Sequence, residues 1–392
     1  MRIQIGNQGR APDNRRLGEY EAFRRLVERR LGLSTLQFLS NELQNQAFQR
    51  SLVSAAQLLG GSVCQRDARG RRLLILAGYV DRMLPNALAD RDGDTHLIAM
   101  YTPLFAALSE FAMFCFTQRA FFADVGDPLA ETSPPPPEGH VPGLWLLRYT
   151  LAGGKVEERH REQFTPRDPV RYDISLYLGY LMARFVWFHE YAHCFNGHVA
   201  YVQENAIALR LYEVSEPSKG APRAAQPAQP GPRDDELRCL ELDADEAAMW
   251  ATLQVQETDR ENLESFASLD RSLRKRLTLF GAYAMTWLFE EFQNYMESNT
   301  GLDHPAPYLR LQNMVHLARQ HFTAPEDQEL QRVVLKEFDH IASVIPNMYR
   351  SDNLMRDISD PWLIGELQRQ LARLDALRPA LAPYRYAPVA GS

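Results

Sequence analysis

The feature that most constrains the fold is a largely apolar segment, residues 174–188, that runs directly into His189-Glu-Tyr-Ala-His193. A segment of this length and hydropathy predicts a helix that is buried in the protein core. Residues four apart lie on the same face of a helix, so His189 and His193 are expected to point in one direction. Burying imidazoles and a carboxylate costs free energy unless these groups have partners, so their presence on a buried helix indicates a functional site.

The spacing of the two histidines is typical of metal ligands. His189 and His193 can both bind one tetrahedral metal ion, with Glu190 leaning toward a water molecule on that metal. Catalytic zinc takes three protein ligands and a water molecule, so a third ligand is expected further along the chain.

An acidic segment, Leu237 to Trp250, supplies candidates for that ligand. It has the packing residues of a helix, and Glu241 and Asp245 are four apart on one of its faces. We expect Glu241 to be the third ligand and Asp245 to accept a ring N–H from a ligand histidine, which would fix the orientation of that ring. The other acidic residues of the region remain rival ligands: Glu236, Asp243 and Glu246. A merely solvated acidic face is the structural alternative.

One more histidine and two cysteines lie near these residues in sequence. His198 is an alternative ligand, but three ligands are already assigned, so we expect it to make a hydrogen bond instead. Cys194 and Cys239 could act as thiolate ligands or switches, although buried, unreactive thiols are the simpler expectation. The four cysteines show no CxxC spacing, which favours a reducing compartment without a disulfide framework.

Composition and charge narrow the class of protein. The chain has 392 residues, of which 45% are hydrophobic and 24% charged, and a net charge of -7, so it is typical of a globular protein. Nucleic-acid binding is not expected, because it needs a concentrated basic surface. Residues 97–117 come nearest to a membrane span, but Pro103, Ser109 and Glu110 interrupt them, so a buried core helix is favoured over a membrane span. The N-terminus has no signal-peptide pattern, and we expect a cytoplasmic location.

Breaks in pattern and composition predict four regions. They are an all-helical N-terminal region (1–130), a Pro-rich linker or loop (131–143), a core that carries the site (144–345), and a helical extension with a loose tail (346–392). Within the core, Gly153-Gly154 between two extended runs predicts a β-hairpin, which could align a substrate strand or be purely structural. Residues 215–235 are rich in Pro, Ala and Gln and predict a disordered insertion.

Three elements of the chain resemble those of gluzincin zinc metallopeptidases, in particular the Ste24/HtpX-like and the Lit-like phage-exclusion peptidases. They are HExxH at 189–193 with Gly-His at 197–198, ExxxD at 241–245, and HPxxxxR from His304 to Arg310. The resemblance spans about residues 174–311 and implies a mainly α, α+β zincin-like fold: a metallopeptidase helix core with a small β-hairpin or sheet. It implies zinc bound by His189, His193 and Glu241. It also implies Glu190 as general base and Asp245 as partner of a ligand histidine, while His304 and Arg310 stabilise the oxyanion or order the site.

The resemblance therefore implies a bacterial, zinc-dependent endopeptidase that hydrolyses intracellular protein or peptide substrates. In such an enzyme Glu190 takes a proton from a zinc-activated water and passes it to the leaving amine. The alternative is a zincin-fold regulator or scaffold that binds a partner with little or no proteolysis, but such a protein does not need Glu190. A membrane-embedded protease would require residues 97–117 or 277–288 to span lipid.

Overall fold

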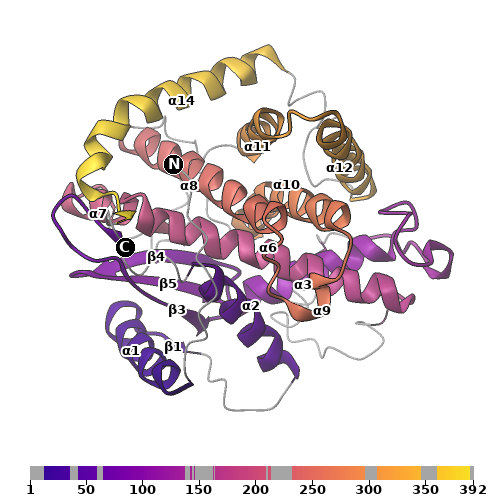
Figure 1. Cartoon of the computed structure of the whole chain (residues 1–392), viewed down its shortest axis with the longest axis horizontal. Coiled ribbons are helices and arrows are strands. Elements are labelled where there is room, and N and C mark those ends of the chain that lie inside the picture. The colour runs from indigo at the N-terminus through magenta and orange to yellow at the C-terminus, as the bar shows by residue number, and fades with distance from the viewer. Residues whose placement is uncertain are drawn as a thin grey trace.

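A long central helix, α6 (Pro169–Phe195), organises the molecule (Figure 1). Asp168 caps its first turn by accepting a hydrogen bond from the backbone N–H of Arg171, and Pro169 occupies the first helical position, where no backbone N–H is needed. All residues from Leu181 to Phe195 are buried, as the apolar run predicts. Gly197 then adopts a left-handed conformation, with φ of 82°, and opens the short helix α7 (His198–Glu204).

The structure is a computed structural model. It describes residues 13–35, 43–59, 65–136, 142–143, 145, 162, 164–208, 211–212, 232–295, 307–345 and 360–388. Over these residues the chain is mainly helical and has a small mixed sheet, which confirms the expected mainly α class. None of the described helices combines the length and the hydropathy needed to cross a bilayer.

The sheet lies beside α6 and has the order β1-β3-β5-β4-β6. Its strands are β1 (Ser34–Thr35), β3 (Leu74–Asp81), β4 (Ala87–Asp92), β5 (Thr95–Tyr101) and β6 (Leu211–Tyr212). Only β3 and β5 pair in parallel; the other neighbours are antiparallel. Helix α1 (Asp13–Leu31) covers one face, where Phe23 and Val27 pack against Val80 and Leu97. Alternate residues such as Ile98 and Met100 join the main core on the other face.

The expectation of an all-helical N-terminal region is therefore wrong. Residues 74–81 form β3, and residues 95–101 form β5 before helix α3 (Thr102–Thr117) begins. β3 and β5 are largely apolar because both faces of the sheet are covered, so they lack the polar alternation that distinguishes a strand from a buried helix. The two-residue Gly93-Asp94 turn between β4 and β5, with Gly93 at φ of 60°, was the local signal of a hairpin.

Helices cover α6 on its remaining sides. α6 packs against α2 (Leu43–Leu59), α3, α8 (Pro232–Glu257) and α10 (Arg271–Tyr295). Further out, α11 (Pro307–His321) and α12 (Pro325–Val344) pack on α10, and α14 (Pro361–Leu381) packs on α8 (Figure 1). The short elements are β2 (Gln65–Arg66), η2 (Pro128–Ala130), α9 (Glu264–Ala267), η3 (Ala382–Tyr384) and β7 (Ala387–Pro388).

The helices expected at 237–250 and 271–292 are present as parts of α8 and α10. The expected hairpin around Gly153-Gly154 lies outside the described residues, as does the expected insertion up to residue 231; its last four residues belong to the first turn of α8. His304 also lies outside them.

We expected a loose tail from Arg378 onward, but the chain up to Pro388 is ordered against the core. α14 continues to Leu381, and β7 pairs with β2. Tyr386 is buried, donates its backbone N–H to the carbonyl of Phe195, and bonds the ring of His96 through its hydroxyl. These contacts join residues far apart in the sequence, so no local pattern announces them.

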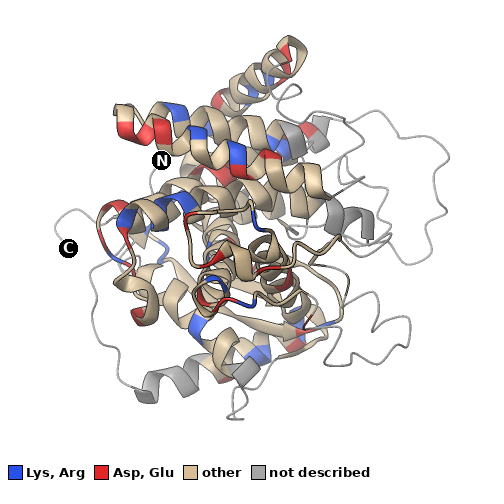
Figure 2. Cartoon of the chain, turned by 90° about the vertical axis from the view of Figure 1, so that its right-hand side faces the viewer, with Lys and Arg blue, Asp and Glu red and all other residues tan. Residues whose placement is uncertain are grey.

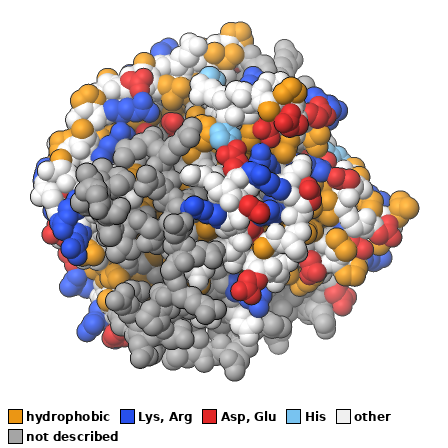
Figure 3. All heavy atoms as spheres, in the orientation of Figure 1, with side chains coloured by type: hydrophobic (Ala, Val, Ile, Leu, Met, Phe, Trp, Pro, Cys, Tyr) orange, Lys and Arg blue, Asp and Glu red, His pale blue; other side chains and the backbone are white. Residues whose placement is uncertain are grey.

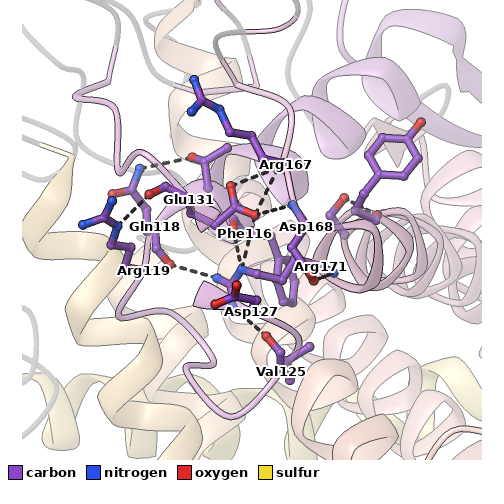
Figure 4. A network of polar contacts seen from close by, with 12 residues as sticks. Phe116, Gln118, Arg119, Val125, Asp127, Glu131, Arg167, Asp168 and Arg171 are labelled. Atoms are coloured by element: carbon purple, nitrogen blue, oxygen red, sulfur yellow. Dashed lines mark hydrogen bonds and ion pairs between the residues drawn. The ribbon is translucent and has the colours of Figure 1, made fainter. Parts of the chain in front are cut away.

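The start of α6 is fixed by a buried arginine (Figure 4). The Arg171 guanidinium donates hydrogen bonds to five backbone carbonyls at the end of α3 and in the loop after it: those of Phe116, Gln118, Phe121, Phe122 and Val125. Beside it, the buried carboxylate of Glu131 accepts the backbone N–H groups of Arg167 and Asp168. Arg171 thus satisfies the carbonyls of a whole loop and holds it against α6.

Candidate metal centre

Two helices that pack against each other bring three ligand-type side chains together. α6 contributes His189 and His193, one turn apart, and α8 contributes Glu241. The Nε2 atoms of the two histidines are 2.9 Å apart. A carboxylate oxygen of Glu241 lies 3.2 Å from Nε2 of His189, and its other oxygen lies 3.4 Å from Nε2 of His193. Each of the three side chains therefore places a ligand-type atom within 4.8 Å of the other two, inside the protein.

This group has the size and chemistry of a metal site. Ligand atoms around a tetrahedral metal at about 2.0–2.1 Å lie about 3.3 Å from one another, close to the distances within this group. Burial lowers the pKa of His193 to about 4, although the carboxylate of Glu241 favours the charged ring. A neutral imidazole is the form that binds a metal, so His189, His193 and Glu241 could hold a metal ion.

Behind the first histidine lies a buried carboxylate. Nδ1 of His189 is 3.0 Å from a carboxylate oxygen of Asp245, which is one helical turn after Glu241. At this distance Asp245 can accept a ring N–H from Nδ1 of His189, which would leave Nε2 of that ring facing the metal group. This is the arrangement expected from the spacing of Glu241 and Asp245.

Arg310, from α11, completes this arrangement. Its Nε and Nη2 atoms each lie 2.7 Å from an oxygen of Asp245, in a bidentate pair that is almost wholly buried. Burial raises the pKa of Asp245, but the charge and hydrogen bonds of Arg310 and the bond from His189 outweigh burial and lower it. The guanidinium thus keeps Asp245 ionised and in place.

Glu190 is buried immediately after the first histidine, and only 1% of its surface is exposed. It therefore lies in the same buried part of α6 as both histidines.

The rival ligands lie elsewhere. Asp243 accepts hydrogen bonds from Nε2 of His198, at 3.1 Å, and from the amide of Asn196, at 2.7 Å. Glu236 accepts the hydroxyl of Tyr201, and Glu246 lies near Arg378 at the edge of the protein. Among the described residues, only His189, His193 and Glu241 form a group that could hold a metal ion.

The cysteines near the ligands are not thiolates. Burial raises the pKa of the Cys194 thiol well above its ordinary value and that of Cys239 to about 11. Both side chains therefore remain protonated at neutral pH; Cys194 packs in the hydrophobic core, and the thiol of Cys239 contacts Gln370.

The sequence interpretation missed one residue near the site, Arg385. It lies in the segment expected to be loose, and its Nη2 atom is 3.4 Å from Asp243. The spacing of residues along the chain contained no signal for this contact.

No protein-family model, no curated protein and no solved structure matches this chain. The class that the geometry defines is a mainly helical protein with a buried His-His-Glu group that could hold a metal ion.

Proposed function

We propose that this protein is a zinc-dependent endopeptidase of the gluzincin type, with a zincin-like core, that hydrolyses peptide bonds of intracellular proteins. The observation that carries the proposal is the convergence of His189 and His193 of α6 with Glu241 of α8 in one buried group. The resemblance of the HExxH and ExxxD elements to those of gluzincin peptidases points to the same class.

Zinc is the metal that the donor set favours. Two imidazole nitrogens and one carboxylate oxygen, close enough for tetrahedral geometry, are a common ligand set of catalytic zinc. Zinc bound there would supply Lewis-acid activation of a water molecule and of the scissile carbonyl.

The side chains around the metal group would divide the remaining tasks. Glu190, buried next to His189, would take the proton of the attacking water and return it to the leaving amine. Asp245 would hold the ring of His189, and Arg310 would hold Asp245. The bidentate pair favours an ordering role for Arg310 over an oxyanion role, so the proposed oxyanion donor is His304 or a tyrosine such as Tyr308.

A second candidate is a regulator with a zincin-like fold that acts by binding a partner. The burial of all three ligand-type residues favours it, because a metal that only stabilises a fold needs no access for substrate. The two candidates differ in their need for Glu190: the peptidase requires it as general base, and the regulator does not.

Two measurements test this proposal: zinc content and the cleavage of fluorescently labelled casein. Both are made on the wild type, on Glu190→Gln and on Glu241→Ala. We expect one zinc per wild-type chain and casein cleavage. Glu190→Gln should keep zinc and lose about 100-fold or more of the activity. Glu241→Ala should lose most of the zinc.

The matched control is Glu236→Gln, which alters an acid of α8 that bonds Tyr201. It should keep both zinc and activity. Equal zinc in wild type and Glu241→Ala would remove the ligand assignment. Zinc binding without casein cleavage by the wild-type protein would favour the regulator.

A further inference from the structure

The second histidine of the metal group also has a partner on its far side. Nδ1 of His193 lies 3.1 Å from Nδ1 of His198, and the two rings meet edge to face. Nε2 of His198 lies 3.1 Å from a carboxylate oxygen of Asp243. Both His198 and Asp243 are buried, so water does not compete for these bonds.

Only one placement of the ring protons serves the metal group. If Nε2 of His193 faces the metal, its Nδ1 carries the proton and donates it to Nδ1 of His198. The ring of His198 then carries its own proton on Nε2 and donates it to Asp243. The chain of bonds thus ends on a carboxylate, as the bond from His189 ends on Asp245.

Asp243 is held by groups from two other parts of the protein. The amide of Asn196, the residue that ends α6, donates to it at 2.7 Å. Arg385 approaches the same oxygen, at 3.4 Å, from the C-terminal segment, residues 384–388. Because Asp243 is 3% exposed and these partners surround it, its position depends on theirs.

The C-terminal segment is itself fastened to the turn between α6 and α7. Tyr386 donates its backbone N–H to the carbonyl of Phe195 at 3.0 Å, and its hydroxyl bonds His96 at 3.1 Å. Tyr384 packs directly on Gly197, where a Cβ atom would come within 2.5 Å of the tyrosine. The segment therefore lies directly over the turn that carries His198.

We propose that His198 and Asp243 are positioning residues for the ligand His193, and that the C-terminal segment holds them in place through Arg385 and Tyr386. This inference rests on the metal group of the proposed function and does not depend on proteolysis. It assigns to the end of the chain a role in setting metal affinity.

The test is metal binding by His198→Phe, Asp243→Asn and Arg385→Gln in the full-length protein. Zinc affinity is measured by competition with a chelator, and ligand geometry by the visible absorption of the cobalt-substituted protein. We expect His198→Phe and Asp243→Asn to weaken zinc binding about 10- to 100-fold and to change the cobalt spectrum. Arg385→Gln should do the same by a smaller factor.

The matched control is Arg373→Gln, which removes another C-terminal arginine, one that pairs with Asp235. It should bind zinc as the wild type does. The melting temperature without metal, measured on every variant, identifies a purely structural effect. Arg385→Gln is the variant least at risk of misfolding, because its side chain is partly exposed.

The outcomes separate this inference from the proposed function. Zinc affinity equal to that of the wild type and an unchanged cobalt spectrum in all three variants would overturn the inference and leave the proposed function standing. Variants that have a lower melting temperature, with zinc affinity and cobalt spectrum unchanged, would have the same consequence. A wild-type protein that binds neither zinc nor cobalt would overturn both.

Discussion

Away from the metal group, Arg184 and Glu261 form a closely paired set of buried charges. Two guanidinium nitrogens of Arg184, on α6, lie 2.7 and 2.9 Å from the two oxygens of Glu261. The hydroxyl of Tyr177 donates to the same carboxylate at 2.6 Å. Burial raises the pKa of Glu261, but the charge and hydrogen bonds of its partners outweigh burial and lower it to about 2.

This pair predicts a defined dependence of stability on pH. The folded-state pKa of Glu261 lies below its ordinary value of 4.5. The contribution of the ionised carboxylate to the free energy of unfolding is therefore complete above pH 4.5 and is lost as pH falls toward 2. We expect Glu261→Gln to lower the free energy of unfolding by about 3 kcal/mol at pH 6. The difference from wild type should shrink steadily between pH 5 and pH 2.

Urea unfolding of both proteins at several pH values measures this difference. Glu264→Gln, which changes a nearby exposed acid in α9, is the control and should follow the wild type. A difference that does not vary with pH would mean that Glu261 acts by packing and not by charge.

At the scale of elements, the position of α6 is fixed by contacts at its two ends. Its first turn is fastened by Arg171 to the loop after α3, and its last turn is fastened by the backbone of Tyr386. The histidines lie near the second end, where the C-terminal segment lies. We therefore expect changes at the two ends to have different effects, on stability at one and on metal binding at the other.

Arg171→Met tests the first end. The change leaves five carbonyls without their donor, and we expect it to lower the free energy of unfolding by at least about 3 kcal/mol. Hydrogen exchange should become faster in residues 116–125. Arg167→Met is the control, because the side chain of Arg167 is exposed and points away from the contacts of Arg171 in Figure 4. Unchanged exchange in this loop would contradict the proposed fastening.

At the scale of the whole molecule, the described surface is mixed in charge and in polarity. Acidic and basic residues are interspersed along the helices seen in Figure 2. On the face shown in Figure 3, apolar side chains scatter among charged ones over the described part. Pairs such as Arg24 with Glu28 and Arg276 with Asp124 neutralise charge locally on this surface.

A metal in this site would join α6 to α8, two helices whose ligand residues are separated by 48 positions from His193 to Glu241. A ligand that binds only the folded state stabilises it by about 2.7 kcal/mol when its concentration is 100 times its dissociation constant. We therefore expect zinc to raise the melting temperature of the wild-type protein and a chelator to lower it.

Glu241→Ala is the control for this prediction, because without the third ligand the chelator should have little effect. Scanning calorimetry with zinc and with chelator measures both proteins. Equal melting temperatures of the wild type under the two conditions would contradict a metal link between α6 and α8.

The sequence by itself determined the parts of the protein that depend on spacing within one helix. The apolar run before His189 predicted α6, and the intervals 189–193 and 241–245 predicted which side chains share a face. These intervals follow from the helical repeat alone, so they hold in any tertiary arrangement.

Only the tertiary structure decided how these helix faces meet. It brought Glu241, and not Glu236 or Asp243, to the histidines, and it paired Arg310 with Asp245. It also made strands of apolar runs near Leu76 and Ile98, and placed the C-terminal segment on Phe195. Each of these outcomes depends on contacts between residues far apart in the chain, and no local periodicity encodes such contacts.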